Sequence, residues 1–323
     1  MDRPPARLVV ICPIHNEEQN IAYFFERLKK TLDALDSNEC TYQLVFTNNR
    51  SVDRSLAIVD ELRRQHAWVG QVTLSRNHGY QLSVLAGLTL ITADLYMICD
   101  VDCEDPPELV HEFLAAIRAG NDLAYGIRNN RDEAWLLSRF RSLFYWSLRT
   151  VGDYRMVPYM AEFSLFKRCV RDIVITSDNS APFLRAEFGY AGFNLVGIPY
   201  RREARRFGKT HYNFIGNAQF AVAGLLSSTT FPLRAIFYAF PLVTLVNVLF
   251  LGAFAGGAID LGTAAIGLVS LNSIFLSGAL AFMAIYLARI YHNGLRRTRF
   301  IIDSTLTALP RSDASAPRDS NGS

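Results

Sequence analysis

The first 128 residues alternate between short apolar runs and longer amphipathic stretches. Short apolar runs bounded by turn residues are typical of buried strands, and apolar residues repeated at helical spacing are typical of helices. The pattern predicts strands at residues 8–13, 42–47, 72–74, 95–99 and 123–125, and helices at residues 16–35, 53–66, 80–92 and 106–119. Strands that alternate with helices favour a mostly parallel sheet with helices on both faces. We therefore expect an α/β fold that binds its ligands beyond the carboxyl ends of the strands.

Two long uncharged stretches follow in the last third of the chain, Ala235–Ala255 and Ala264–Ala288. Each is long enough to cross about 30 Å of hydrocarbon as a helix rising about 1.5 Å per residue. The alternative is a buried helical hairpin, which would need a large domain around it. The link between the stretches carries one charge, Asp260, whereas Arg234 and the cluster Arg289–Arg299 flank them. The positive-inside rule then predicts two transmembrane helices with both flanks in the cytoplasm.

Changes in composition divide the chain into four expected parts. These are an α/β domain at residues 1–211, an amphipathic juxtamembrane helix at 212–230, two transmembrane helices at 231–290, and a cytoplasmic basic segment with a disordered tail at 291–323. Met1–Arg7 lead directly into the first strand, so we expect no signal peptide. The five scattered cysteines are expected to be free thiols. A net charge of +3 is too small to indicate nucleic acid binding.

An acidic segment, Asp100-Val-Asp102-Cys-Glu104-Asp105-Pro-Pro, directly follows a predicted buried strand. Clustered carboxylates repel each other unless a cation neutralises them. Oxygen ligands suit Mg²⁺ or Mn²⁺, which commonly bridge a diphosphate to protein carboxylates. The alternative interpretation is an acidic loop that caps the next helix, and we expect Asp105 to be that cap. The segment alone leaves both interpretations open.

A basic segment lies between the predicted sheet and the transmembrane stretches, from Tyr200 to Tyr212. Its arginines suit a phosphate or diphosphate, since guanidinium groups bind phosphate oxygens in pairs. A patch that faces anionic lipid headgroups is the alternative, and both can hold at once. The basic residues are Arg201, Arg202, Arg205, Arg206 and Lys209.

Two further segments are candidates for binding or catalysis. The backbone amides of Ser75–Gly79, together with Arg76, can face an anion, although an ordinary loop has the same composition. Glu162 lies in an apolar segment, where a carboxylate can act as a base or as a positioning group. The alternative for Glu162 is a structural acid paired with a base.

The order and spacing of these segments resemble the family 2 glycosyltransferases of GT-A fold. More narrowly, they resemble the polyprenyl-phosphate glycosyltransferases, the group that contains dolichol-phosphate mannose synthase, and the resemblance runs from Leu8 to Ile302. Cys12–Glu18 is similar to P-x-Y-N-E-E, Phe46–Asp53 to V-D-D-G-S-T-D, Leu74–Gly79 to L-S-R-N-x-G, Asp100–Pro107 to D-A-D-L-Q-D-P-P, Tyr125–Arg128 to Y-G-x-R, and Arg205–Tyr212 to R-x-x-G-x-S-x-Y. Met160–Phe163 takes the place of T-G-D-F, so Glu162 replaces an aspartate, and Asn48-Asn49 replaces an aspartate pair.

The resemblance implies a set of site residues. It implies that donor-binding residues are Pro13, His15, Glu17, Asn49, Ser51, Asp53, Arg76, Asp100 and Lys209. Mg²⁺ or Mn²⁺ would be held by Asp100, Asp102 and Glu104, and the catalytic group would include Asp102, Glu162 and the acceptor-phosphate residues Arg128, Arg202 and Arg205. Asn49 stands where the family has an aspartate that contacts the base, which leaves the nucleotide open because an amide has a different donor and acceptor pattern.

The implied activity is inverting transfer of a sugar from a nucleotide diphosphate sugar to a polyprenyl phosphate, undecaprenyl or dolichyl. The expected location is the inner membrane, as a multi-pass protein with a cytoplasmic catalytic domain. Expected partners are the donor, the polyprenyl phosphate acceptor, the lipid membrane and further copies of the chain, with no nucleic acid. Alternatives are another lipid or glycan acceptor, or a catalytically impaired membrane scaffold that binds nucleotide sugars. A processive polysaccharide synthase is disfavoured, since no Q-x-x-R-W motif is present.

Overall fold

A computed structural model describes residues 4–128, 157, 160–177, 179, 182–205 and 229–310. Lys209 and residues 212–228 of the expected juxtamembrane helix lie outside these ranges. The first half of the described chain alternates strands and helices as the apolar pattern predicts. Its elements are β1 (Ala6–Ile14), α1 (Ile21–Asp33), β2 (Cys40–Asn48), α2 (Ser55–Gln65), β3 (Val69–Thr73), α3 (Tyr80–Leu90), β4 (Leu95–Ile98), the 3₁₀ turn η1 (Pro107–Leu109), α4 (Val110–Arg118) and β5 (Leu123–Arg128).

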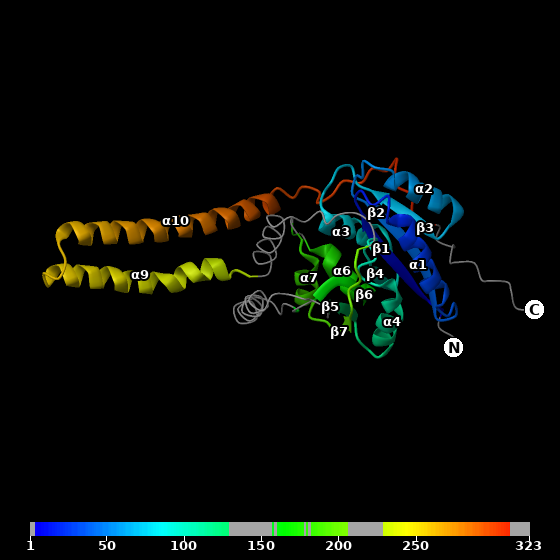
Figure 1. Ribbon diagram of the computed structural model, residues 1–323, viewed down its shortest axis with the longest axis horizontal. Coiled ribbons are helices and arrows are strands. Elements are labelled where there is room, and N and C mark those ends of the chain that lie inside the picture. The colour runs from blue at the N-terminus through cyan, green and yellow to red at the C-terminus, as the bar shows by residue number, and fades with distance from the viewer. Residues whose placement is uncertain are drawn as a thin grey trace, which may run out of the picture.

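Four further elements of the α/β domain lie in the part of the chain that the structure describes, and none of them was predicted from the sequence. They are β6 (Met160–Lys167), α6 (Arg168–Thr176), α7 (Leu184–Ala191) and β7 (Leu195–Tyr200). The strand order is β3-β2-β1-β4-β6-β5-β7, and β6 runs antiparallel to both β4 and β5. All other neighbouring strands are parallel. The sheet is therefore mostly parallel, with one reversed strand, β6, between β4 and β5 (Figure 1).

Alternate residues of β1 enter the two halves of the core, as the two-residue period of a strand requires. Leu8 and Val10 pack with α1, α2 and α4 on one face, and Val9 and Ile11 pack with α3, α6 and α7 on the other. The N-terminal part of α3 lies close to the end of β4, and its C-terminal end is fixed by Arg171. The buried guanidinium donates to the backbone oxygens of Leu88, Thr89 and Ile91.

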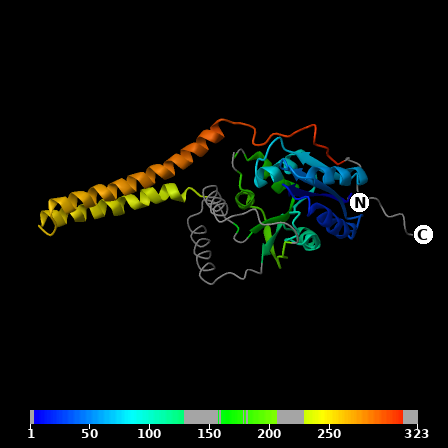
Figure 2. The same ribbon diagram turned by 45° about the horizontal axis from the view of Figure 1, so that its top comes forward.

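Two long helices, α9 (Phe231–Ala255) and α10 (Leu261–Gly294), form an antiparallel hairpin that projects from the α/β domain (Figures 1 and 2). Both are long and apolar enough to cross a membrane, and their apolar segments are not buried by the rest of the chain. The structure therefore contradicts the alternative of a hairpin buried in a soluble core. Asn247 and Asn272 join the helices by reciprocal side-chain hydrogen bonds of 3.1 and 3.0 Å.

The chain returns to the sheet after α10, a feature that the sequence analysis did not assign. Residues 300–310, here called the C-terminal strap, run along β3, the edge strand of the sheet (Figure 1). The amide of Gln71 donates to the backbone oxygen of Ala308 at 2.8 Å, and the amide of Ala308 donates back to that of Gln71 at 2.9 Å. The amide of Asp303 donates to Thr73. The strap thereby covers hydrogen-bonding groups that an edge strand would otherwise leave unpaired.

Candidate active site

The candidate site lies where β1, β2 and β4 end, at the carboxyl edge of the parallel strands. In open α/β sheets this edge is where ligands bind. Three loops meet there: residues 15–20 after β1, residues 49–54 after β2, and residues 99–106 after β4. Because β1 lies between β2 and β4, loops far apart in the sequence become neighbours.

The first two loops are held together by hydrogen bonds from the backbone of one to the side chains of the other. The amide of Asn16 donates to Ser51 Oγ at 3.0 Å, and the amide of Glu18 donates to Asp53 Oδ2 at 3.1 Å. Burial disfavours the charged form of Asp53, but hydrogen bonds from Ser55 and Glu18 outweigh burial and lower its pKa. The amide of Glu17 donates to Ser55 Oγ at 2.9 Å, so Glu17, Ser51 and Asp53 lie in two loops that contact each other.

Asn49 connects the β2 loop to the loop that precedes α3. Its Nδ2 donates to Asn77 Oδ1 at 2.9 Å, and its Oδ1 accepts the amide of His78 at 2.8 Å. His15 lies on the same side, with Nδ1 at 3.1 Å from the backbone oxygen of Asn49. An aspartate at position 49 would accept from His78 but would have no hydrogen to donate to Asn77. Asn49, which departs from the family pattern, therefore connects the two loops by a hydrogen bond to Asn77 that an aspartate could not donate.

The loop before α3 also carries Arg76, which is exposed. The C-terminal strap reaches the same loop, because the amide of Ser75 donates to the backbone oxygen of Ile301 at 2.9 Å. Burial, and then the charge of Arg76, lower the pKa of His78. The residues around Asn49 are thus connected to the strap that follows α10.

The carboxylates of Asp100 and Asp102 lie half-buried directly after β4. The Tyr80 hydroxyl donates to Asp100 Oδ1 at 2.8 Å. Burial, and then the nearby charges of Asp102, Asp105 and Glu162, raise the pKa of Asp100 well above its ordinary range. Burial and then Asp105 raise the pKa of Asp102 to about 6, although Arg205 and Arg202 act in the opposite direction. Excess negative charge is therefore concentrated at this point.

Glu162, on β6, faces the same region and is 8% exposed. Gln81 Nε2 donates to Glu162 Oε1 at 2.5 Å, and Arg185 Nε lies 3.5 Å from the same oxygen. Tyr80 and Gln81 are consecutive residues in the first turn of α3, so one helical turn contacts both Asp100 and Glu162. The sequence predicts the helix but not these two contacts, because they depend on how α3 packs on the sheet.

Asp105 is not the helix cap that the sequence analysis expected. The residue that precedes η1 is Pro106, and η1 has no side-chain cap. Asp105 is 2% exposed, accepts a hydrogen bond from Tyr200, and forms an ion pair with Arg128 at 2.9 Å. A buried carboxylate requires such partners, which local helix rules do not take into account. Arg128 also donates to the Tyr200 hydroxyl at 3.1 Å.

The start of the basic segment crosses the acidic loop. The amide of Glu203 donates to the backbone oxygen of Glu104 at 2.8 Å. Arg202 forms an ion pair with Glu104, and Arg205 forms one with Glu17 at 2.8 Å. Among the described residues, no group of three or more His, Cys, Asp and Glu side chains is arranged to hold a metal ion. Glu104 as a third metal ligand stays a prediction, and in this structure its carboxylate binds Arg202.

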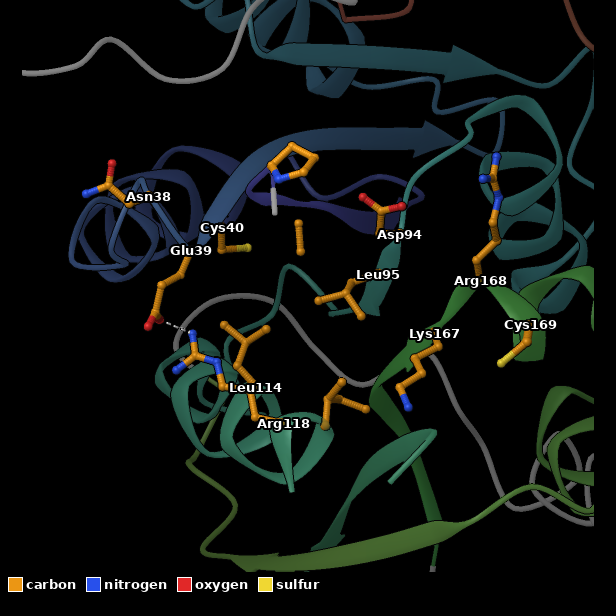
Figure 3. Close-up of a pocket in the computed structure, with 13 residues that line it drawn as sticks. Asn38, Glu39, Cys40, Asp94, Leu95, Leu114, Arg118, Lys167, Arg168 and Cys169 are labelled. Carbon is orange, nitrogen blue, oxygen red and sulfur yellow. Dashed lines mark ion pairs between the residues drawn. The ribbon is translucent and has the colours of Figure 1, made fainter. Parts of the chain in front are cut away.

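A separate hollow of about 750 Å³ opens at the opposite, amino-terminal edge of the strands (Figure 3). Cys40, Asp94 and Lys167 are among the residues that line it, and Glu39 and Arg118 form an ion pair at its rim. None of the predicted site residues lines this hollow. It is therefore distinct from the candidate site.

Comparison with known proteins identifies the family. Glycosyl transferase family 2 matches residues 9–183, more than half of the chain. An undecaprenyl-phosphate 4-deoxy-4-formamido-L-arabinose transferase from Edwardsiella ictaluri is 26% identical over 308 residues, which cover 93% of this chain and 94% of that protein. A prophage bactoprenol glucosyl transferase homolog from Escherichia coli is 25% identical over 303 residues, covering 92% and 98%.

Among solved structures, a mannosyltransferase from Pyrobaculum calidifontis in complex with GDP-Man and Mn²⁺ matches with a TM-score of 0.47 and 17% identity, covering 90% of this chain and 87% of that one. The mostly parallel sheet with helices on both faces, followed by two apolar helices, is the GT-A domain with a C-terminal hairpin that the resemblance implied. The chain belongs to glycosyl transferase family 2 and is a glycosyltransferase.

Proposed function

We propose that this protein transfers a sugar from a nucleotide diphosphate sugar to a polyprenyl phosphate at the cytoplasmic face of the inner membrane, with inversion at the anomeric carbon. One observation carries the proposal. Carboxylates cluster at the end of β4, close to Arg202 and Arg205. The domain that carries them is attached to two helices of membrane-spanning length. Relatives of similar length whose names specify undecaprenyl phosphate or bactoprenol support the choice of acceptor.

Asp100 and Asp102 fit a divalent cation. Burial and neighbouring acids raise the pKa of both carboxyls, and a cation would relieve that repulsion. Mg²⁺ or Mn²⁺ bound there would neutralise charge on the leaving diphosphate. The Tyr80 hydroxyl orients Asp100 for this role. The loops that carry Glu17, Asn49 and Asp53 would receive the nucleoside.

The acceptor phosphate would lie against Arg128, Arg202 and Arg205. Each of these arginines is paired with a carboxylate, namely Asp105, Glu104 and Glu17. We infer that a phosphate competes for these guanidinium groups, since phosphate accepts paired hydrogen bonds as a carboxylate does. A phosphate monoester is already anionic near neutral pH, so it requires no strong base. Glu162, held by Gln81, would therefore orient the acceptor instead of removing a proton.

The α9–α10 hairpin would hold the catalytic domain beside its lipid substrate. Confinement to the membrane raises the effective concentration of a lipid acceptor without adding contacts. Arg234 lies in the first turn of α9, and the arginines between 289 and 299 lie near and after the end of α10, whereas the turn between the helices contains only Asp260 as a charged residue. This distribution favours a cytoplasmic α/β domain.

The test uses the purified full-length chain with Mn²⁺, radiolabelled nucleotide diphosphate sugars and undecaprenyl phosphate. Label that enters the lipid phase, and that is lost in Asp102→Ala, supports the proposal. Asp36→Ala is the matched control, because Asp36 is exposed and lies between α1 and β2, at the edge of the sheet opposite the candidate site. Labelling of a lipid without a phosphate would indicate another acceptor. Absence of a lipid product with every donor would favour a scaffold that binds nucleotide sugars.

A further inference from the structure

Arg27, on α1, binds two glutamates from distant parts of the chain. Its Nε and Nη2 donate to Glu108 at 2.7 and 2.8 Å, and its Nη1 and Nη2 donate to Glu203 at 2.9 and 2.7 Å. The Arg27 side chain is 17% exposed, whereas Glu108 and Glu203 are about half exposed. A planar guanidinium that meets two carboxylates in this way fixes their positions more strictly than an ordinary surface ion pair does.

Glu203 lies within the stretch Arg201–Arg205 that crosses the acidic loop. Its amide donates to the backbone oxygen of Glu104, so its backbone and its side chain are both fixed. Arg202, directly before Glu203, forms an ion pair with Glu104, and Arg205, two residues after it, forms one with Glu17. Glu203 is thus a central attachment point between two arginines that face the candidate site.

The carboxylate of Glu203 is held by Arg27, although Glu203 is itself part of a basic segment. Glu104 contacts the backbone of Glu203, and Glu108 shares the same guanidinium. Without Arg27, two carboxylates would remain next to each other with no cation between them, and their repulsion would favour movement of the mobile partner. Glu108 belongs to the 3₁₀ turn that precedes α4, whereas Glu203 belongs to a segment without regular structure. The segment with Glu203 would therefore move.

We propose that Arg27 is a positioning residue for the transfer reaction: by holding Glu203, it keeps Arg202 and Arg205 over the acidic loop, where they can bind a phosphate. Arg27 itself touches no substrate. The proposal rests on the function proposed above, since the two arginines matter only if a phosphate binds there. Arg27 lies 176 positions before Glu203 in the sequence, and no motif contains it.

The first experiment measures position without any substrate. Hydrogen exchange of residues 201–205 is compared in the full-length wild type, Arg27→Gln, Glu203→Gln and Glu108→Gln. The first two substitutions should accelerate exchange of the Glu203 amide, which donates to Glu104. Glu108→Gln is the matched control, because it removes the other half of the same network and leaves the contact between Arg27 and Glu203. Equal acceleration in all three variants would overturn the proposal, since it would indicate that the whole network of Arg27, Glu108 and Glu203 stabilises this region, and not the contact between Arg27 and Glu203 in particular.

The second experiment measures catalysis. Arg27→Gln should raise KM for undecaprenyl phosphate about tenfold, by analogy with the loss caused by a misplaced binding group, and should change KM for the nucleotide sugar much less. Glu203→Gln should reproduce this effect, and the double variant should be no worse than either single variant, because both act through one contact. Additive losses, or an unchanged KM, would contradict the proposal. If exchange changes as expected but the wild type makes no lipid product, the proposed function fails while the positional role of Arg27 stands.

Discussion

At the scale of single residues, the chemistry of the site depends on the negative charge gathered around Asp100 and Asp102. Asp100 receives a hydrogen bond from Tyr80, and Asp102 receives partial compensation from Arg205 and Arg202. The place of most motif residues at strand ends could be predicted from the sequence, because the motifs follow predicted strands, whereas Glu162 lies inside β6. Their partners Tyr80, Gln81 and Arg185 could not, since side-chain contacts across elements depend on packing that no local pattern specifies.

The affinity for Mn²⁺ should fall as the pH decreases through about 6. The pKa of Asp102 is raised from 3.8 to about 6, so below that pH the carboxyl holds a proton that the cation must displace. We expect a loss of up to about tenfold per pH unit below 6, measured by calorimetric titration of the full-length protein at pH 5 and pH 7.5. Proton release on binding at the lower pH is the accompanying signal. Equal affinity at both values would contradict the assignment.

The raised pKa of Asp102 makes stability change with pH in the opposite direction to metal affinity. Between about pH 4 and pH 6 the folded chain holds more protons at Asp102 than the unfolded chain, so this group makes the metal-free protein less stable as the pH rises through that window. Thermal unfolding in the presence of a chelator, at pH 4.5 and 6.5, measures the effect. Asp102→Asn should reduce this pH dependence, because an amide does not titrate.

Removal of the Tyr80 hydroxyl should weaken Mn²⁺ binding about three- to tenfold, which corresponds to the loss of one ordinary hydrogen bond. The hydroxyl donates to Asp100 and favours its charged form. Tyr80→Phe keeps the ring, so the fold should persist. Tyr190→Phe serves as the control, since Tyr190 is 59% exposed on α7. Equal affinities for Mn²⁺ in wild type and Tyr80→Phe would show that the hydroxyl does not support the carboxylate.

At the scale of elements, the apolar pattern predicted β1–β5 and the helices between them, because buried parallel strands and amphipathic helices have distinct periods. It did not predict β6 or β7. β6 carries Glu162 and Ser164 among apolar residues, and β7 contains Gly197 and Pro199, which are residues that weaken a strand signal. The antiparallel position of β6 between β4 and β5 depends on tertiary packing. This position brings Glu162 beside α3.

The C-terminal strap offers a test at this scale. A Cβ at Gly70 would lie 2.3 Å from Pro310 Cδ, so Gly70→Ala should displace the end of the strap and leave the strand itself in place. We expect a loss of about 1–2 kcal/mol in the free energy of unfolding, and faster hydrogen exchange at the Ala308 amide, which donates to Gln71. Adding Pro310→Gly should restore slow exchange only in part, because the Cβ would still lie 2.8 Å from the backbone nitrogen of residue 310. Unchanged exchange at Ala308 in Gly70→Ala would mean that the strap does not depend on this contact.

At the scale of the whole molecule, the hairpin interrupts a domain that the chain leaves and then rejoins. β7 precedes the hairpin, and the strap after α10 pairs with β3 at the far edge of the sheet. α10, with 34 residues, extends about 50 Å, which exceeds a hydrocarbon core of about 30 Å. The last turns of α10 would therefore lie outside the bilayer. The strap that follows them contacts the loop before α3, since the amide of Ser75 donates to Ile301, and so connects the end of α10 to the candidate site.

This arrangement predicts a definite topology. Among the cysteines, Cys169 is exposed, whereas Cys12, Cys40, Cys99 and Cys103 are buried. If the α/β domain is cytoplasmic, a membrane-impermeant maleimide should not label the wild type in cells with a permeabilised outer layer, but it should label Cys169 in inverted vesicles. Ala258→Cys, placed in the exposed turn between α9 and α10, should show the reverse pattern once Cys169 is replaced by serine. Labelling of both positions from the same side would contradict a hairpin that spans the membrane, and would place α9 and α10 along its surface.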